Sequence, residues 1–243
     1  ADAGITYELT CTNPIYTLDG SGSDIGMDYI WSTLNGNIIS GSTTLTPVID
    51  VAGTYTLLVK NLNNNCETTS DVIITQNSTL PIANAGGTLE INCNNPTIDL
   101  DGNLSSTGVN YAYTWTGGSI TSGANTLSPT VSASGTYNLL VEDLSNGCTA
   151  TDNVVVMGDF VLPIVDAGNS VVLDCINSSN NLSGSGDSGV NYSTTWTTTS
   201  GNIISGTNTF NPVVNLPGSY TLTIENLNNG CTNSDNVVVV QNT

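Results

Sequence analysis

Apolar and polar residues alternate in short runs along the whole chain, at the period of two that is typical of β-strands with one buried face. The clearest run is Tyr55-Thr56-Leu57-Leu58-Val59, in which Tyr55, Leu57 and Val59 share one face. Residues 237–240 are four consecutive valines, which predicts a last strand that is central in its sheet or covered on both faces. Turn dipeptides such as Asn35-Gly36 separate the runs. The pattern therefore predicts an all-β chain of short strands.

The same series of landmarks occurs three times along the chain. The opening Ala1-Asp2-Ala3-Gly4 recurs 82 residues later as Ala83-Asn84-Ala85-Gly86, and 82 residues after that as Val165-Asp166-Ala167-Gly168. A repeat of this length predicts three tandem domains, residues 1–82, 83–164 and 165–243.

Each unit carries one Trp early and one Tyr two residues after a Gly. The Gly-x-Tyr pattern resembles the tyrosine corner of immunoglobulin-like sandwiches, in which the Tyr hydroxyl bonds to nearby backbone. We expect the Trp side chains to pack between two sheets, because an indole buries a large apolar area. The predicted core residues are Trp31, Trp115, Trp196, Tyr55, Tyr137 and Tyr220.

Six cysteines fall two to a unit, and three equivalent units favour pairing inside each one. This hypothesis gives Cys11–Cys66, Cys93–Cys148 and Cys175–Cys231, although six cysteines allow other pairings. Each bridge would close a loop of about 55 residues, worth roughly 4 kcal/mol of stability. Zinc is the alternative, but the chain has no His and no Cys-x-x-Cys spacing. Disulfides indicate an oxidising compartment.

The links between units are short and contain proline. They read Leu80-Pro81-Ile82 and Leu162-Pro163-Ile164, with no Gly- or Ser-rich spacer. Proline restricts the backbone and stiffens a link. The three units are expected to form a semi-rigid rod of roughly 100–120 Å, from strands of ordinary length placed end to end.

The charge balance excludes several classes of function. The chain has 20 acidic residues, one basic residue and no His, for a net charge of −19. Such a surface repels nucleic acids and anionic membranes, and no apolar run is long enough to span a bilayer. Acid–base and covalent catalysis lack their usual groups, and the best carboxylate pair, Asp99 and Asp101, occurs in one unit only. We predict that the chain is not an enzyme, and interpret it as a mature or internal fragment.

No cofactor is required, and calcium is the one candidate ligand, because it prefers carboxylate and other hard oxygen ligands. One candidate set lies in a loop and consists of Asp19, Ser21 and Asp24. A second set lies near the links between units, with an Asp at a unit's start facing an Asp before the last strand. These residues are Asp2, Asp166, Asp71, Asp152 and Asp235. The alternative interpretation is that all of them are solvated turn residues and strand-end caps.

Several short motifs resemble those of polycystic-kidney-disease (PKD) repeats. They are the Asp-Ala-Gly opening, Leu18-Asp19-Gly20-Ser21, the Tyr-x-Trp at residues 29–31 and 113–115, and Gly53-Thr54-Tyr55. The form with paired cysteines is similar to the tandem repeats of large secreted surface proteins of gliding bacteria. Its second cysteine closes an Asn-rich turn, here Asn64-Asn65-Cys66, Asn146-Gly147-Cys148 and Asn229-Gly230-Cys231.

The resemblance covers the whole chain and implies an immunoglobulin-like sandwich in each unit. It also implies an extracellular, cell-surface role as a spacer or adhesin stalk. The third unit departs from the pattern, with Ser183-Gly184 in place of Asp-Gly and Thr194 in place of the Tyr of Tyr-x-Trp. A metal role for Asp19 would therefore not be shared by all units.

Three functions compete at this point. The first is a stalk segment of a repetitive bacterial adhesin, and the second is a subunit of a homopolymeric extracellular filament. The third is a carbohydrate-binding accessory module of a secreted enzyme, which would need exposed aromatic side chains such as Tyr7 or Tyr192. The expected partners are neighbouring repeats of the same protein, further copies in a fibre, and surface glycans or other cells.

Overall fold

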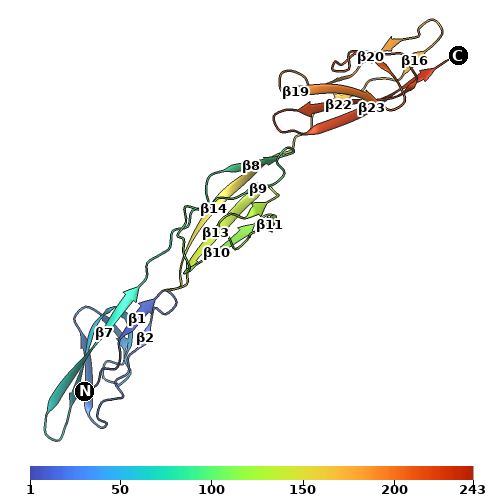
Figure 1. The fold of residues 1–243 in the computed structure, drawn as a ribbon. Coiled ribbons are helices and arrows are strands. Elements are labelled where there is room, and N and C mark those ends of the chain that lie inside the picture. The colour runs from blue at the N-terminus through green and yellow to red at the C-terminus, as the bar shows by residue number, and fades with distance from the viewer. Residues whose placement is uncertain (243) are drawn as a thin grey trace.

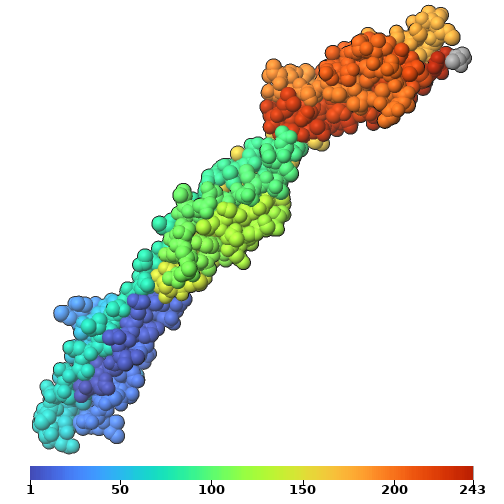
Figure 2. Space-filling view, viewed as in Figure 1, coloured from blue at the N-terminus to red at the C-terminus, as the bar shows by residue number. Residues whose placement is uncertain are grey.

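The computed structural model describes residues 1–242 and is an elongated rod of three β-bodies in chain order (Figure 1). The space-filling view shows the three bodies following one another along one long axis, with narrow links between them (Figure 2). Every regular element of the described part is a strand, and none of its segments is a helix that could cross a membrane. The N-terminus and the C-terminal end lie at opposite ends of the rod (Figure 1).

The first body is a sandwich of two sheets. The larger sheet has the order β1 (Tyr7–Thr10), β7 (Glu67–Asn77), β6 (Gly53–Lys60) and β3 (Asp28–Thr33). The smaller sheet has the order β2 (Tyr16–Thr17), β5 (Val48–Val51) and β4 (Asn37–Ser40). All neighbours are antiparallel except β1, which runs parallel to the last part of β7.

The second body repeats both sheets with the same strand order. Its larger sheet contains β8 (Leu89–Asn92), β14 (Cys148–Asp159), β13 (Gly135–Asp143) and β10 (Tyr111–Gly117). Its smaller sheet contains β9 (Ile98–Asp99), β12 (Thr130–Val131) and β11 (Ile120–Ser122).

The third body repeats them again and adds a small two-stranded sheet. Its larger sheet contains β16 (Val171–Leu173), β23 (Thr232–Gln241), β22 (Gly218–Asn226) and β19 (Tyr192–Thr198). Its smaller sheet contains β17 (Asn180–Asn181), β21 (Val213–Val214) and β20 (Ile203–Ser205), and the added pair is β15 (Val165–Asp166) with β18 (Ser185–Gly186). The fold is three tandem immunoglobulin-like β-sandwiches.

The core of each sandwich lies between its two sheets and follows the alternation of the sequence. In β6, Tyr55, Leu57 and Val59 point inward and are buried, while Thr54 is exposed and faces solvent. The Trp and Tyr side chains identified in the sequence are buried in all three units, none of them more than 3% exposed.

Each buried aromatic residue also places its polar atom on a backbone carbonyl. The indole nitrogens of Trp31, Trp115 and Trp196 donate to the carbonyls of Thr44, Thr126 and Thr209 at 2.9, 2.9 and 3.0 Å. The Tyr55 hydroxyl donates to the Val51 carbonyl at 2.5 Å, and Tyr137 and Tyr220 bond to Ala133 and Leu216 at 2.7 Å. These are tyrosine corners, each closing the turn that leads into β6, β13 or β22.

The last strand of each unit is central in its larger sheet, as one of the two predicted alternatives has it, and only one of its faces is covered. Val237 and Val239 are buried, whereas Val238 and Val240 are 48% and 44% exposed. The same alternation leaves Ile73 and Val155 exposed in the other units. A two-layer sandwich has no third layer to cover the outer face of its sheets, so these valines contribute to strand formation more than to burial.

The prediction of a disulfide within each unit is also wrong. The described chain forms Cys11–Cys148 and Cys93–Cys231, while Cys66 and Cys175 are free and exposed. The physical reason is the parallel pairing of β1 with the end of β7, where Thr10 lies opposite Asn77. Cys11 therefore lies at the end of β7, and Cys66 precedes its start. The eleven residues of β7 separate the two cysteines by about 35 Å, far beyond the reach of a disulfide.

Candidate functional site: the disulfide-linked junctions between sandwiches

The first junction joins the loop after β1 to the start of β14 in the next sandwich. The Cα atoms of Cys11 and Cys148 are 5.0 Å apart across the disulfide, and Cys148 is 1% exposed. Beside the bridge, the Cys11 backbone N–H donates to the Asn146 carbonyl at 3.1 Å. A covalent bond and a backbone hydrogen bond therefore hold the first sandwich against the base of the second.

Asn146 ties this junction together through its side chain. Its Oδ1 accepts from the Cys148 N–H at 2.8 Å and so fixes its own turn. Its Nδ2 donates at 3.0 Å both to Oδ1 of Asn77 and to the carbonyl of Thr79, which belong to the preceding unit. Asn146 is 2% exposed, so these bonds are shielded from water. A buried amide that loses its partners would cost about 1–3 kcal/mol, which makes this contact specific.

The second junction has the equivalent disulfide and asparagine contacts, and its backbone hydrogen bond starts one residue later in the loop. The Cα atoms of Cys93 and Cys231 are 5.0 Å apart, and the Asn94 N–H donates to the Asn229 carbonyl at 3.1 Å. The fully buried Asn229 side chain donates to Oδ1 of Asp159 at 2.9 Å and to the Val161 carbonyl at 3.1 Å. The disulfide and the asparagine contacts occur at both junctions, so they are a repeating feature of the array.

A glycine between the Asn and the Cys allows the close approach. Gly147 and Gly230 have φ values of +68° and +70°, in the left-handed region that glycine adopts most easily. A Cβ on Gly147 would collide with the Thr12 side chain, and one on Gly230 would collide with Asn94. At these two junctions the glycine suits the left-handed backbone and leaves room for the neighbouring sandwich.

Pro81 and Pro163 in the links are buried, but the aliphatic side chains on either side of them contribute little to the junctions. Leu80 and Ile82 in the first link are 64% and 63% exposed, and Leu162 and Ile164 in the second are 56% and 71% exposed. The relative position of neighbouring sandwiches therefore depends on the peptide link, the disulfide and the asparagine hydrogen bonds.

Sequence reasoning noted the Asn-rich turns but did not place them at a junction. The available signal was the position of the cysteines along the strands, because one follows the first strand and the other precedes the last. In a sandwich where those strands run parallel, these positions lie at opposite ends of the unit. Only a neighbouring unit can then bring two cysteines together.

Two of the predicted calcium ligands bind the backbone at a unit's start. Asp152 and Asp235 each accept from the N–H of an alanine, Ala85 and Ala167, at 2.8 Å. The pKa of Asp235 lies below its ordinary value, chiefly because of the hydrogen bond from Ala167. In the first unit Ser70 holds this position and accepts from Ala3 at 3.1 Å.

The other predicted ligands serve local turns or strand pairs. Asp2 and Asp166 accept from the N–H two residues later, at 2.9 and 2.8 Å. Asp19 accepts from the N–H of Ser21 at 2.9 Å, and hydrogen bonds from the Ser21 side chain and backbone lower the pKa of Asp19. Asp71 accepts from the Thr56 hydroxyl at 2.7 Å.

The backbone carbonyl of Asp24 accepts a hydrogen bond from the Tyr29 hydroxyl at 2.8 Å. Within residues 1–242, no three His, Cys, Asp or Glu residues come close enough together to hold a metal ion. Calcium binding stays a prediction.

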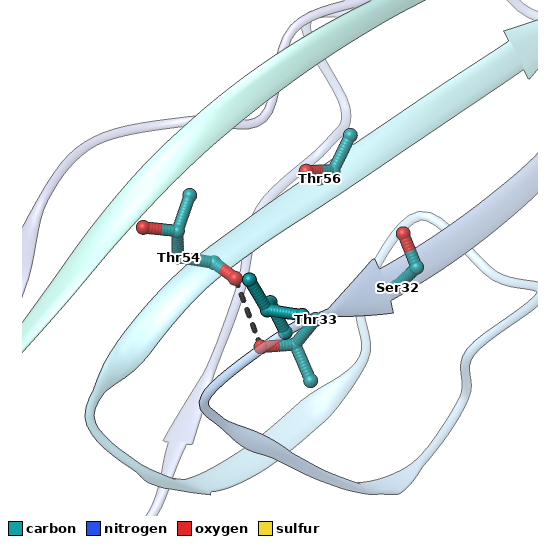
Figure 3. Close-up of a pocket in the computed structure, with 5 residues that line it drawn as sticks. Ser32, Thr33, Thr54 and Thr56 are labelled. Carbon is teal, nitrogen blue, oxygen red and sulfur yellow. Dashed lines mark hydrogen bonds between the residues drawn. The ribbon is translucent and has the colours of Figure 1, made fainter.

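A hollow of about 520 Å³ lies on the first sandwich where β3 ends and β6 begins (Figure 3). Its lining consists of Ser32, Thr33, Leu34, Thr54 and Thr56, so it presents hydroxyl and methyl groups. The Thr33 hydroxyl is already engaged, because it donates to the Thr54 carbonyl at 2.8 Å (Figure 3). No titratable group lines this hollow, and we assign no chemistry to it.

The two tyrosines proposed as a sugar platform are partly buried. Tyr7 stacks on Tyr16, with ring centroids 3.8 Å apart and ring planes 7° apart, and both pack against the core of the first unit. Tyr192 packs against the core of the third unit. These rings contribute to the sandwiches and offer only part of their faces to a ligand.

The fold and its junctions define the class of protein: a rod of immunoglobulin-like sandwiches in which each disulfide joins one sandwich to the next. No family model and no curated protein matches the chain. Among solved structures, the titin I-band fragment I67-I69 is 10% identical with a TM-score of 0.42, covering 100% of this chain and 98% of that one. Drosophila N-cadherin EC1-4 is 12% identical with a TM-score of 0.33, and the match covers 98% of this chain and 75% of that one. Similarities this distant carry no argument about function.

Proposed function

We propose that this chain is an extracellular load-bearing spacer, a segment of the stalk of a repetitive bacterial surface adhesin. The observation that supports it is that both disulfides join neighbouring sandwiches at equivalent positions. A bridge inside one domain protects that domain, whereas a bridge between domains controls how the array responds to bending and pulling.

The two bridges shorten the covalent path from one end of the rod to the other. That path runs through residues 1–11, crosses to 93–148 and crosses again to 231–243, so it contains about 80 of the 243 residues. A chain stretches to about 3.5 Å per residue, so the oxidised rod could not exceed roughly 280 Å, against roughly 850 Å for the reduced chain. The bridges therefore act as a limit on extension.

Bending is restricted at the same places. Each junction has three connections, which are the proline-containing link, the disulfide, and the buried asparagine that reaches back to the preceding unit. Connections at separate points resist rotation better than one peptide link. A spacer that presents a distant binding element benefits from this stiffness.

The chemistry of the chain suits an extracellular setting. Disulfides persist in oxidising compartments. The chain also carries one Lys and no Arg, so a trypsin-like protease has a single cleavage site at Lys60, whose side chain pairs with Glu67 at 2.9 Å. Both features favour long survival outside a cell.

Single-molecule pulling tests the extension limit. The molecule used is the full chain with Cys66→Ser and Cys175→Ser, which removes both free thiols and leaves both junction bridges. We expect detachment after about 280 Å of total extension when oxidised, and after about 850 Å with a reducing agent. An oxidised chain that extends to the full reduced length would overturn the proposal.

A further inference from the structure

The two free cysteines stand at opposite ends of the rod and are equivalent to two cysteines that bond to each other. Cys66 occupies in the first unit the place that Cys148 and Cys231 hold in the others. Cys175 occupies in the third unit the place of Cys11 and Cys93. The rod therefore presents one half of a junction at each end, and the two halves are complementary.

The half at Cys66 already has the shape of a junction turn. Asn64 accepts from the Cys66 N–H at 2.9 Å through its side-chain Oδ1, as Asn229 does with Cys231 at the same distance. The Asn65 N–H donates to the Asn61 carbonyl at 2.8 Å, and Asn65 has a φ of +58°. Asn64 is exposed here, whereas its equivalents are buried against another unit.

The half at Cys175 is also preformed. Asp174 Oδ1 accepts from the N–H groups of Ile176 and Asn177 at 2.8 and 2.6 Å. At the second junction, Asn92 makes the same pair of bonds around Cys93, at 3.1 and 2.9 Å. The loop thus holds its cysteine in the conformation that a junction uses.

An acceptor for the asparagine of a further unit is also in place. Asn242 follows the second cysteine of its unit by the same number of residues as Asn77 and Asp159, which bind the junction asparagines through Oδ1. Its N–H donates to the Leu173 carbonyl at 2.9 Å, which keeps it beside the loop of Cys175.

We propose that Cys175 of one copy of this segment forms a disulfide with Cys66 of a second copy, so that rods join head to tail. Cys66 precedes β7 in the first body and Cys175 follows β16 in the third body, so the two thiols cannot meet within one molecule (Figure 1). A contact between two different ends leaves a free end on each side, which generates an open linear filament. The inference rests on the proposed spacer function and adds the partner with which the spacer continues.

The bond requires an oxidant, for which a low-molecular-weight disulfide such as oxidised glutathione suffices. One protein thiolate attacks this disulfide, forms a mixed disulfide and releases one glutathione thiol. The second protein thiolate displaces the other glutathione. Two protein thiols lose two protons and two electrons, and one glutathione disulfide becomes two thiols.

The new junction lacks the peptide link, whose Thr79 or Val161 carbonyl accepts from the asparagine in the two observed junctions. It also differs at one pair of facing positions. Asn65 stands where the other turns have Gly147 and Gly230, and Ile176 stands where the other loops have Thr12 and Asn94. A Cβ on either glycine would collide with the facing residue, so Asn65 and Ile176 crowd each other. We expect Asn65→Gly to speed bond formation.

The test mixes two variants that each keep one free thiol, Cys66→Ser and Cys175→Ser, in a glutathione redox buffer. We expect a disulfide-linked heterodimer at least about tenfold more abundant than either homodimer on non-reducing gels, with Cys66 linked to Cys175 in its peptide map. The unmodified chain should give a ladder of longer products. Heterodimers no more abundant than random pairing predicts would overturn the proposal.

Matched variants separate recognition from simple thiol reactivity. Asn64→Ala removes the side chain whose equivalents reach across each junction, and we expect it to reduce heterodimer formation. Asn63→Ala alters a neighbouring exposed side chain, equivalent to exposed residues in the other turns, and should change nothing. Equal effects of the two variants would contradict recognition through the turn.

The two proposals can fail separately. Random pairing of the free thiols, together with the short extension limit in pulling, would remove head-to-tail joining and leave the spacer. Specific heterodimers, together with an oxidised rod that extends to its full reduced length, would remove the spacer function and leave head-to-tail joining.

Discussion

At the scale of single residues, the junctions depend on the two different ends of an asparagine amide. In Asn229 the oxygen accepts from the Cys231 N–H, and the nitrogen donates to Asp159 and Val161 of the preceding unit. Aspartate has no donor and would bring a second negative charge to Asp159. Alanine would leave the Cys231 N–H without its acceptor. Asparagine satisfies both sides with one buried side chain.

Single carboxylates also stabilise the start of a unit, and Asp235 makes this dependent on pH. The fold lowers its pKa, so ionised Asp235 stabilises the folded state above its unfolded pKa of about 4. This contribution is lost as the pH falls through the lower pKa of the folded state. We expect Asp235→Asn to lower the unfolding temperature at pH 7, and the difference from the unmodified chain to close towards pH 2.

Asp71→Asn is the matched control, because Asn153 and Asn236 hold its place in the other units. It provides the baseline for removing one negative charge from the next position along the last strand of another unit. A difference for Asp235→Asn that is equally large at pH 7 and pH 2 would contradict the assigned role.

At the scale of elements, the parallel pairing of the first strand with the last decides where the cysteines lie. Because β1 runs parallel to the end of β7, one cysteine of each unit lies at its far end and the other at its near end. Antiparallel pairing would have brought them together inside the unit. The direction of one short strand thus decides whether a cysteine bonds within its own domain or to the next domain.

The hairpin turn between β13 and β14 should be sensitive to any side chain at Gly147. In Gly147→Ala the left-handed backbone costs about 1–2 kcal/mol, and the new Cβ also lies 3.1 Å from the Cβ of Thr12, which rotation of Thr12 cannot relieve. We expect Cys11–Cys148 to form slowly or incompletely, seen as more than two free thiols per chain in a thiol assay.

Gly26→Ala is the control for this prediction. Gly26 has a φ of +75°, but a Cβ there would meet no atom within 4 Å. It carries the backbone cost without the collision, and its thiol count should stay at two. A normal thiol count in Gly147→Ala would show that the junction tolerates a side chain at this position.

At the scale of the whole molecule, the junction bridges should set the stiffness of the rod. We expect Cys11→Ser combined with Cys148→Ser to widen the angular distribution at the first junction and leave the second unchanged. Single-molecule energy transfer can measure this, with dyes on unnatural amino acids at Leu34 and Val109 for the first junction, and at Val109 and Val190 for the second. These side chains are 93%, 96% and 94% exposed, so labels should not disturb the cores.

The second junction is an internal control in that experiment. The reciprocal variant, Cys93→Ser with Cys231→Ser, should reverse the result. Unchanged distributions at both junctions would mean that the peptide links and asparagine contacts alone hold the angle.

The sequence by itself determined the interior of each sandwich. Alternation in strands such as β6 and the recurrence of Trp31 and Tyr55 identified the β-class, the repeat and the buried aromatic residues, because side chains in a strand alternate between faces whatever the neighbours are. The sequence did not predict that Val238 is exposed, because a run of identical residues shows no alternation between faces.

Only the tertiary structure decided the pairing of the cysteines. The sequence gives each cysteine's place along a strand, but not whether that strand runs parallel or antiparallel to its partner. Direction depends on how the two sheets close around their core, which involves residues far apart in the chain. Cys11 therefore meets Cys148 across a junction, and Cys66 is left at the end of the rod.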